Sequence, residues 1–204
     1  RARNVMVGIV PGGCHEESPD SRECLRLVHD EIALRGFQVG ILPLSSFGAL
    51  TCQANVINDW LREHAEHEII LVSLSKGSSE VKLALRDDPE SFRPVSAWIN
   101  VSGLLFGSEW VSWLLDRTIS RWGARIWCRY WGYSYAVLEQ LRREAGSLLD
   151  FDLHVPDHLS TFHIYGIPLC NRLTHPYTRP SFERLASRVQ NDGIGVILGD
   201  LTLL

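Results

Sequence analysis

A strand that stops at a serine constrains this chain more than any other stretch. The uncharged run from Ile69 to Leu74 has the Ile and Val content of a strand buried on both faces of a parallel sheet. Farther along, Val81 and Leu85 fall at helical spacing, so the apolar period changes from that of a strand to that of a helix. The sequence therefore predicts a strand-to-helix bend with Ser75 at its apex.

Small residues flank Ser75 at two positions on each side, Ser73 before it and Gly77 after it. A tight bend needs them because larger side chains would collide with the neighbouring strand and helix. The stretch Ser73-Leu74-Ser75-Lys76-Gly77 resembles the Gly-x-Ser-x-Gly signature of the α/β-hydrolase family, with Ser73 replacing the first glycine. The alternative interpretation is an ordinary strand followed by a serine that caps a helix.

Apolar runs alternate with helical stripes along the first half of the chain. The expected strands are residues 5–10, 37–44, 69–74 and 95–101, and the helices after the first two strands are expected to be capped by Ser18 and Thr51. A later strand is expected at 162–169. Strands that alternate with helices indicate right-handed crossovers and a mostly parallel sheet, so the expected architecture is the three-layer α/β-hydrolase fold.

The length of 204 residues favours a single domain spanning 1–204. The formal net charge of -4 gives no basic footprint, so nucleic acid and anionic membrane surfaces are poor default partners. No stretch approaches the roughly 20 apolar residues of a membrane-spanning helix, so we expect no stable membrane insertion. The sequence does not predict an oligomeric state.

The cysteines indicate a reducing compartment. Their total of five is odd, and none forms a Cys-x-x-Cys pair. This pattern argues against a disulfide framework and against a structural zinc site. We expect a cytoplasmic protein with no metal and no cofactor. The first residue is Arg1 and not an initiator methionine, so an upstream targeting segment stays an open alternative.

Residues 104–150 differ in composition from the rest of the chain and are expected to form a helical insertion, with one helix from Tyr135 to Glu144. Tryptophans and arginines are interleaved here: Trp110, Trp113, Arg117, Arg121, Trp122, Arg125, Trp127, Arg129 and Trp131. Either the indoles are buried against the sheet, or the segment is a cap or lid over the Ser75 site. The second interpretation suggests an apolar acyl substrate that contacts Trp110 and Trp113.

The loop Pro11-Gly12-Gly13-Cys14 follows the first strand, where the resemblance places half of an oxyanion hole. Glycine there lets a backbone N–H approach a developing oxyanion. The resemblance implies Gly13 as the first donor, with Cys14 as the alternative, and the N–H of Lys76 as the second. A phosphate-binding loop is the competing interpretation, but no Gly-Lys-Ser/Thr follows Gly13.

A serine nucleophile needs a histidine to take its proton and an acid to orient that histidine. Asn191-Asp192-Gly193 resembles the Asn-Asp-Gly of bacterial lipases and related esterases, which implies Asp192 as the acid; the plain alternative is a turn. The histidines that follow Ser75 are His154, His158, His163 and His175. All precede Asp192, against the family's chain order. We therefore expect the catalytic histidine, with the last part of the fold, beyond Leu204.

These residues together suggest a serine hydrolase that cleaves a carboxylic ester or related small acyl substrate through Ser75. Asp192 and the backbone of Gly13 and Lys76 would assist the reaction. The alternative is a catalytically silent binding protein with the same fold. An acyltransferase would use the same residues, so the sequence does not separate it from a hydrolase.

Overall fold

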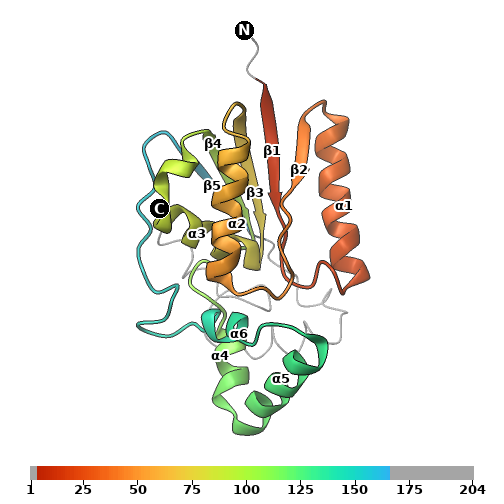
Figure 1. The fold of residues 1–204 in the computed structure, drawn as a ribbon, viewed down its shortest axis with the longest axis vertical. Coiled ribbons are helices and arrows are strands. Elements are labelled where there is room, and N and C mark those ends of the chain that lie inside the picture. Colours follow the sequence, from red (N-terminus) through yellow and green to blue (C-terminus); the bar gives the residue numbers. More distant parts are fainter. Residues whose placement is uncertain (1–3, 166–204) are drawn as a thin grey trace.

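The computed structural model describes residues 4–165, which form a parallel sheet with helices around it (Figure 1). The strands are β1 (Val5–Val10), β2 (Gln38–Ile41), β3 (Glu68–Leu74), β4 (Val95–Val101) and β5 (Ser160–Ile164). They are hydrogen bonded in the order β2-β1-β3-β4-β5, and every pair is parallel. The predicted α/β class with a parallel sheet is confirmed.

The connections between these strands place helices on both faces of the sheet. They contain α1 (Pro19–Leu34), α2 (Leu50–Glu63), α3 (Lys76–Asp87) and the short 3₁₀ helix η1 (Pro89–Phe92). The step from β1 to β2 runs in one direction across the sheet, whereas the steps to β3 and β4 run in the other. Right-handed crossovers therefore put α1 on one face and the pair α2 and α3 on the opposite face. The Asn58 Nδ2 donates to Ala84 O at 3.2 Å and links α2 to α3.

The helix after Ser75 is the most deeply buried of the helices in this part of the chain. Residues 76–85 of α3 are all buried, including the charged Lys82. Lys82 Nζ donates to Leu105 O at 2.9 Å and to Leu149 O at 2.8 Å, and it lies over the rings of Phe106 and Phe151. Lys82 thus ties α3 to both ends of the 104–150 segment.

Several expected boundaries were wrong. The strand expected at 162–169 is β5, which runs from Ser160 to Ile164. Two other differences follow from a contact distant in sequence or from a backbone constraint. Thr51 does not cap α2, since the helix begins at Leu50. Its first N–H is capped instead by Gln140 Oε1 at 2.6 Å, a residue 90 positions away. The strand expected over 37–44 ends at Ile41, shortly before Pro43, which has no N–H for the ladder.

Three helices lie between β4 and β5: α4 (Glu109–Asp116), α5 (Thr118–Trp131) and α6 (Ala136–Gln140). Figure 1 shows them beyond the carboxyl ends of the strands. The helix expected from Tyr135 to Glu144 is only the five residues of α6. The interpretation that the indoles are buried against the sheet is wrong for four of them, which remain exposed: Trp110, Trp122, Trp127 and Trp131. The function of a lid over Ser75 stays a prediction.

Candidate active site

The strand register brings three loops to one edge of the sheet. Val10 pairs with Ser73, and Ser73 pairs with Asn100, so β1, β3 and β4 end at the same level. The loop after β1 contains Gly12 and Gly13, whereas β3 is followed by Ser75. The carboxyl edge of a parallel sheet is where such folds bind ligands. These residues are therefore neighbours although more than sixty positions separate them.

Ser75 lies at the predicted bend in a strained backbone conformation. Its φ of 48° and ψ of -116° place it in a region that residues other than glycine rarely occupy, at a cost of about 1–3 kcal/mol. Its N–H donates to Val101 O at 3.0 Å, and its carbonyl accepts from Ser78 N at 3.1 Å and Leu104 N at 3.2 Å. These bonds hold the strained residue in place.

The bend at Ser75 packs so closely against the loop after β1 that only glycine fits at position 77. A Cβ on Gly77 would lie 2.6 Å from Pro11 O and 2.9 Å from Val10 O, both of which are fixed backbone atoms. A Cβ on Gly12 would lie 3.2 Å from Leu74 O and 3.4 Å from Ser75 Cβ. The contact explains why glycines occur on both sides of it.

Ser73, which departs from the Gly-x-Ser-x-Gly pattern, takes part in a buried chain of hydrogen bonds. Its Oγ accepts from Trp98 Nε1 at 2.7 Å and lies 2.8 Å from Ser78 Oγ. Ser78 Oγ donates onward to Asn100 Oδ1 at 2.6 Å. Because the single hydroxyl proton of Ser78 goes to Asn100 Oδ1, Ser78 Oγ accepts from the Ser73 hydroxyl. The serine therefore has a structural role that a glycine could not fill.

His163 lies at the end of this chain. Its Nδ1 is 2.9 Å from Asn100 Nδ2, which can only donate, so Nδ1 accepts and the ring proton is on Nε2. Burial lowers the pKa of His163 below its usual value, which favours the neutral ring. His163 also has ring contacts with Tyr165, which stacks on it, and with Trp98, which lies edge-on to it.

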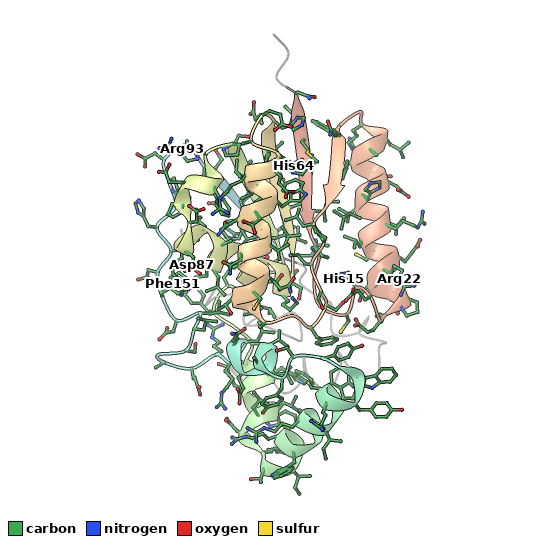
Figure 2. The ribbon with its side chains drawn as sticks, viewed as in Figure 1. His15, Arg22, His64, Asp87, Arg93 and Phe151 are labelled. Atoms are coloured by element: carbon green, nitrogen blue, oxygen red, sulfur yellow. The ribbon has the colours of Figure 1, made fainter. Side chains whose placement is uncertain are left out.

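The loop after β1, whose stretch Pro11-Gly12-Gly13-Cys14 is here named the glycine loop, is hydrogen bonded to the loop after β2. His15 Nδ1 donates to the carbonyl of Gly12 at 2.8 Å and lies 3.1 Å from Ser46 Oγ. Ser46 N donates to Glu16 Oε2 at 2.9 Å, and Glu16 N donates to Ser46 Oγ at 3.0 Å. Figure 2 labels His15 at the carboxyl end of the sheet and Arg22 on α1. These bonds fix the backbone on both sides of Gly13.

Lys76 follows Ser75, and its side chain runs beneath the same loop. Lys76 Nζ forms a buried ion pair with Glu80 and lies 3.5 Å from Ser45 O. Burial raises the pKa of the Glu80 carboxyl to about 7, and the nearby ammonium opposes that rise. Within residues 4–165, Glu80 Oε2 has no hydrogen-bond partner. The pair is held in a site where the charged carboxylate is costly.

Two backbone N–H groups at this edge are free to bind an anion. Among the described residues, neither Gly13 N nor Lys76 N donates to another group. Lys76 is the first residue of α3, where helical N–H groups lack partners within the helix and the helix dipole favours negative charge. Cys14, the alternative to Gly13, is exposed with a φ of 61°.

A cavity of about 360 Å³ opens beside Ser75, between the glycine loop and α1. Its lining consists of Gly12, Gly13, His15, Asp20, Ser21, Cys24, Leu25, Leu74 and Ser75. Sequence reasoning missed His15, Cys24 and Leu25 as neighbours of Ser75. A signal was present for His15, which directly follows the glycine loop. The helical residues of α1 carry no such signal, because only the fold brings that helix to Ser75.

The structure does not place the predicted acid or two of the candidate histidines at the carboxyl edge of the sheet. Asp192 and His175 lie outside residues 4–165. His158 Nε2 is 3.1 Å from Phe92 O and lines a second cavity with Asn4 and Pro94, near the amino ends of the strands. Within the part of the chain that the structure describes, no three His, Cys, Asp or Glu side chains cluster as metal ligands would.

Comparison with known proteins finds similarity in three-dimensional structure and none in sequence. No protein-family model and no curated protein sequence matches the chain. The metagenomic carboxyl esterase MGS0156 aligns with 96% of this chain at 18% identity and a TM-score of 0.75. The fold is that of the α/β-hydrolases. This chain covers 60% of the length of MGS0156.

Two further solved structures share the fold. The mature Bacillus licheniformis lipase BlEst2 aligns with 96% of this chain, at 16% identity and a TM-score of 0.61, and 78% of the lipase is covered. Phospholipase PlaB from Legionella pneumophila aligns with 96% of this chain at 15% identity and a TM-score of 0.63, and 44% of PlaB is covered. Identities this low establish the fold and leave the chemistry to the residues of this chain.

The hydrogen bond to the Trp98 indole predicts the effect of removing the Ser73 hydroxyl. Ser73→Ala leaves the buried Trp98 Nε1 without its acceptor, so the free energy of unfolding should fall by about 1–3 kcal/mol in urea titrations. The matched control is Ser96→Ala on β4, where a half-buried hydroxyl makes one 3.4 Å contact. Equal losses in the two variants would contradict the role given to Ser73.

The raised pKa of Glu80 predicts a pH-dependent stability. The Glu80 carboxyl has a pKa of about 7 in the folded protein, whereas its ordinary pKa, which we take for the unfolded chain, is 4.5. Glu80 therefore binds its proton more tightly in the folded state. The folded state therefore holds the extra proton between these values, and the free energy of unfolding should fall as pH rises from about 4.5 to about 7. Glu80→Gln should lack this component of the slope, whereas the exposed Glu63→Gln should keep it. The slopes of the two variants come from urea unfolding at a series of pH values, and identical slopes would refute the assignment.

Proposed function

We propose that this protein is a serine hydrolase that cleaves a carboxylic ester, with Ser75 as its nucleophile. The observation that carries the proposal is the strained Ser75 at the end of β3, beside a cavity and next to two unpaired backbone N–H groups. Strain of this kind persists where the surroundings enforce it, and it clusters at active sites. The alternative of a simple helix cap is weakened because the Ser75 side chain makes no capping hydrogen bond to α3.

In the proposed reaction, Ser75 Oγ attacks the ester carbonyl carbon while a histidine takes the hydroxyl proton. The carbonyl oxygen becomes an oxyanion, which accepts hydrogen bonds from Gly13 N and Lys76 N. Loss of one such donor typically costs about 2.7–4 kcal/mol of barrier. The histidine then gives its proton to the departing alcohol, and water releases the acid from the acyl-enzyme by the same steps. Asp192 is the proposed partner of that histidine.

The cavity beside Ser75 supports a site for the acyl group. Cys24 and Leu25 from α1, with Leu74 from β3, supply its apolar wall. A volume of about 360 Å³ is at the small end of ligand sites, so it suits an acyl chain of modest length. The solved structures with this fold include an esterase, a lipase and a phospholipase by their names, which supports ester substrates in general.

Labelling of the full-length protein with a fluorophosphonate probe tests the nucleophile. Wild-type protein should be labelled and Ser75→Ala should not, because the probe phosphonylates only an activated serine hydroxyl. Ser102→Ala is the matched control, since Ser102 also has a positive φ, at the end of the neighbouring β4, and its loss should leave labelling intact. Label retained in Ser75→Ala would refute the assignment. Absence of label in wild type would favour the catalytically silent binding protein, and product analysis with competing alcohols would separate a hydrolase from an acyltransferase.

Chain-length preference tests the acyl site. Cys24→Trp should lower kcat/KM for long acyl esters at least about tenfold relative to short ones, because the indole fills the cavity. Leu27→Trp on the same helix is the control, since Leu27 is exposed and lies outside the cavity lining. If the acyl chain instead contacts the 104–150 segment, Trp110→Ala and Trp113→Ala will change the preference and Cys24→Trp will not.

A further inference from the structure

Helix α5 carries an apolar face that points to solvent. Ile119, Trp122, Ile126 and Tyr130 recur at helical spacing, and their residues are 88%, 62%, 63% and 80% exposed. Their spacing of three, four and four positions lines them up along one side of the helix. Contiguous apolar surface of this kind marks an interaction site, unlike single exposed hydrophobic residues.

The opposite side of α5 is anchored to the protein, so the exposed face is held in position. Cys128, on the side opposite Ile126, is buried. At the flank of the helix, the Trp127 ring packs edge-on against Phe47 at 5.2 Å between centroids. The helix ends at Gly132, whose φ of 72° suits a left-handed cap. The face runs from Ile119 to Tyr130, which corresponds to about 17 Å along the helix axis.

The charge along α5 is entirely positive. Between Arg117 and Gly132 the sequence has arginines at 117, 121, 125 and 129 and no acidic residue, in a chain whose formal net charge is -4. Arg125 and Arg129 lie beside Trp122 on the helical circumference, at one border of the apolar face. Arg125 Nη2 lies 3.8 Å from Glu139, and Arg129 has no ion pair within residues 4–165. The local charge is thus opposite in sign to that of the chain as a whole.

From these observations we propose that α5 binds the surface of an anionic lipid bilayer, lying in the plane of the interface. The aliphatic and indole side chains enter the boundary between headgroups and acyl chains, while the arginines at the border contact lipid phosphates. Ile119 and Ile126 offer no ring for a base to stack on, which favours lipid over nucleic acid. None of the helices within residues 4–165 is both long and apolar enough to cross a bilayer.

This proposal differs from the expectation, based on overall charge, that anionic membranes are poor partners. Net charge averages over all faces, whereas a surface interaction falls off within a Debye length and therefore depends on the face that is presented. Figure 1 shows α4 and α5 at the end of the molecule away from the amino ends of the strands. Binding through α5 would turn the carboxyl edge of the sheet, with Ser75, toward the lipid. The proposal does not depend on the chemistry of Ser75.

Co-sedimentation of the full-length protein with vesicles tests the proposal. Vesicles of equal parts phosphatidylglycerol and phosphatidylcholine should bind the protein, whereas pure phosphatidylcholine should bind it weakly. Added salt should weaken the first interaction. Arg129→Gln should reduce the partition coefficient about fivefold, the equivalent of about 1 kcal/mol per arginine near the surface. Ile126→Glu should abolish detectable binding.

Matched variants separate the proposal from its alternatives. Leu34→Glu makes the same kind of change on α1, where Leu34 is 81% exposed, and should bind as wild type does. Ser75→Ala should also bind normally, so a failure of the proposed function leaves this result unaffected. Equal binding by Ile126→Glu and Leu34→Glu, or equal affinity for the two vesicle types, would overturn the proposal. A wild-type dimer that Ile126→Glu converts to a monomer in sedimentation equilibrium would do so too, and would assign the face to a second copy of the chain.

Discussion

The close contact between the bend at Ser75 and the loop after β1 is the constraint on which the rest of this edge depends. Gly77 leaves no room for a Cβ against the carbonyls of Val10 and Pro11, so α3 begins directly beside the end of β1. The same approach brings the Gly12–Gly13 backbone against Ser75. Since both strands end at one level, the strained Ser75 lies beside the loop that contains Gly12 and Gly13.

Side chains buried around this contact make it rigid. Trp98, Ser73, Ser78 and Asn100 form one chain of hydrogen bonds under the bend, in which each hydroxyl has both an acceptor and a donor role. On the other side, the Lys76–Glu80 pair fills the space under the glycine loop. The arrangement includes a Glu80 carboxylate whose charged form is disfavoured, so the stability of this region depends on pH close to Ser75.

The sequence predicted those features that depend on local pattern. The strands from Val5 and Val95 and the bend at Ser75 follow from short-range periodicity, and β1 and β4 have the expected bounds. It missed features that arise from distant contacts, such as the capping of Leu50 by Gln140 and the place of Cys24 beside Ser75. The exposure of the indoles on α5 was missed for the same reason, because a stripe of Trp and Ile has the same spacing whether it faces a core or solvent.

The exposed apolar face of α5 is unfavourable in water, so a partner that covers it would stabilise the protein. Its position relative to Ser75 bears on which partner that is. The face lies on an insertion between β4 and β5. Lys82 of α3 donates two hydrogen bonds to this insertion, and Gln140 of the insertion makes two hydrogen bonds to α2. Such anchors fix the ends of the insertion while they leave the outer side of α5 free of packing. An ester whose alcohol or acyl part belongs to a lipid is concentrated at an interface. A surface that holds the protein there would raise the local supply of substrate at the carboxyl edge without any change in the chemistry of Ser75.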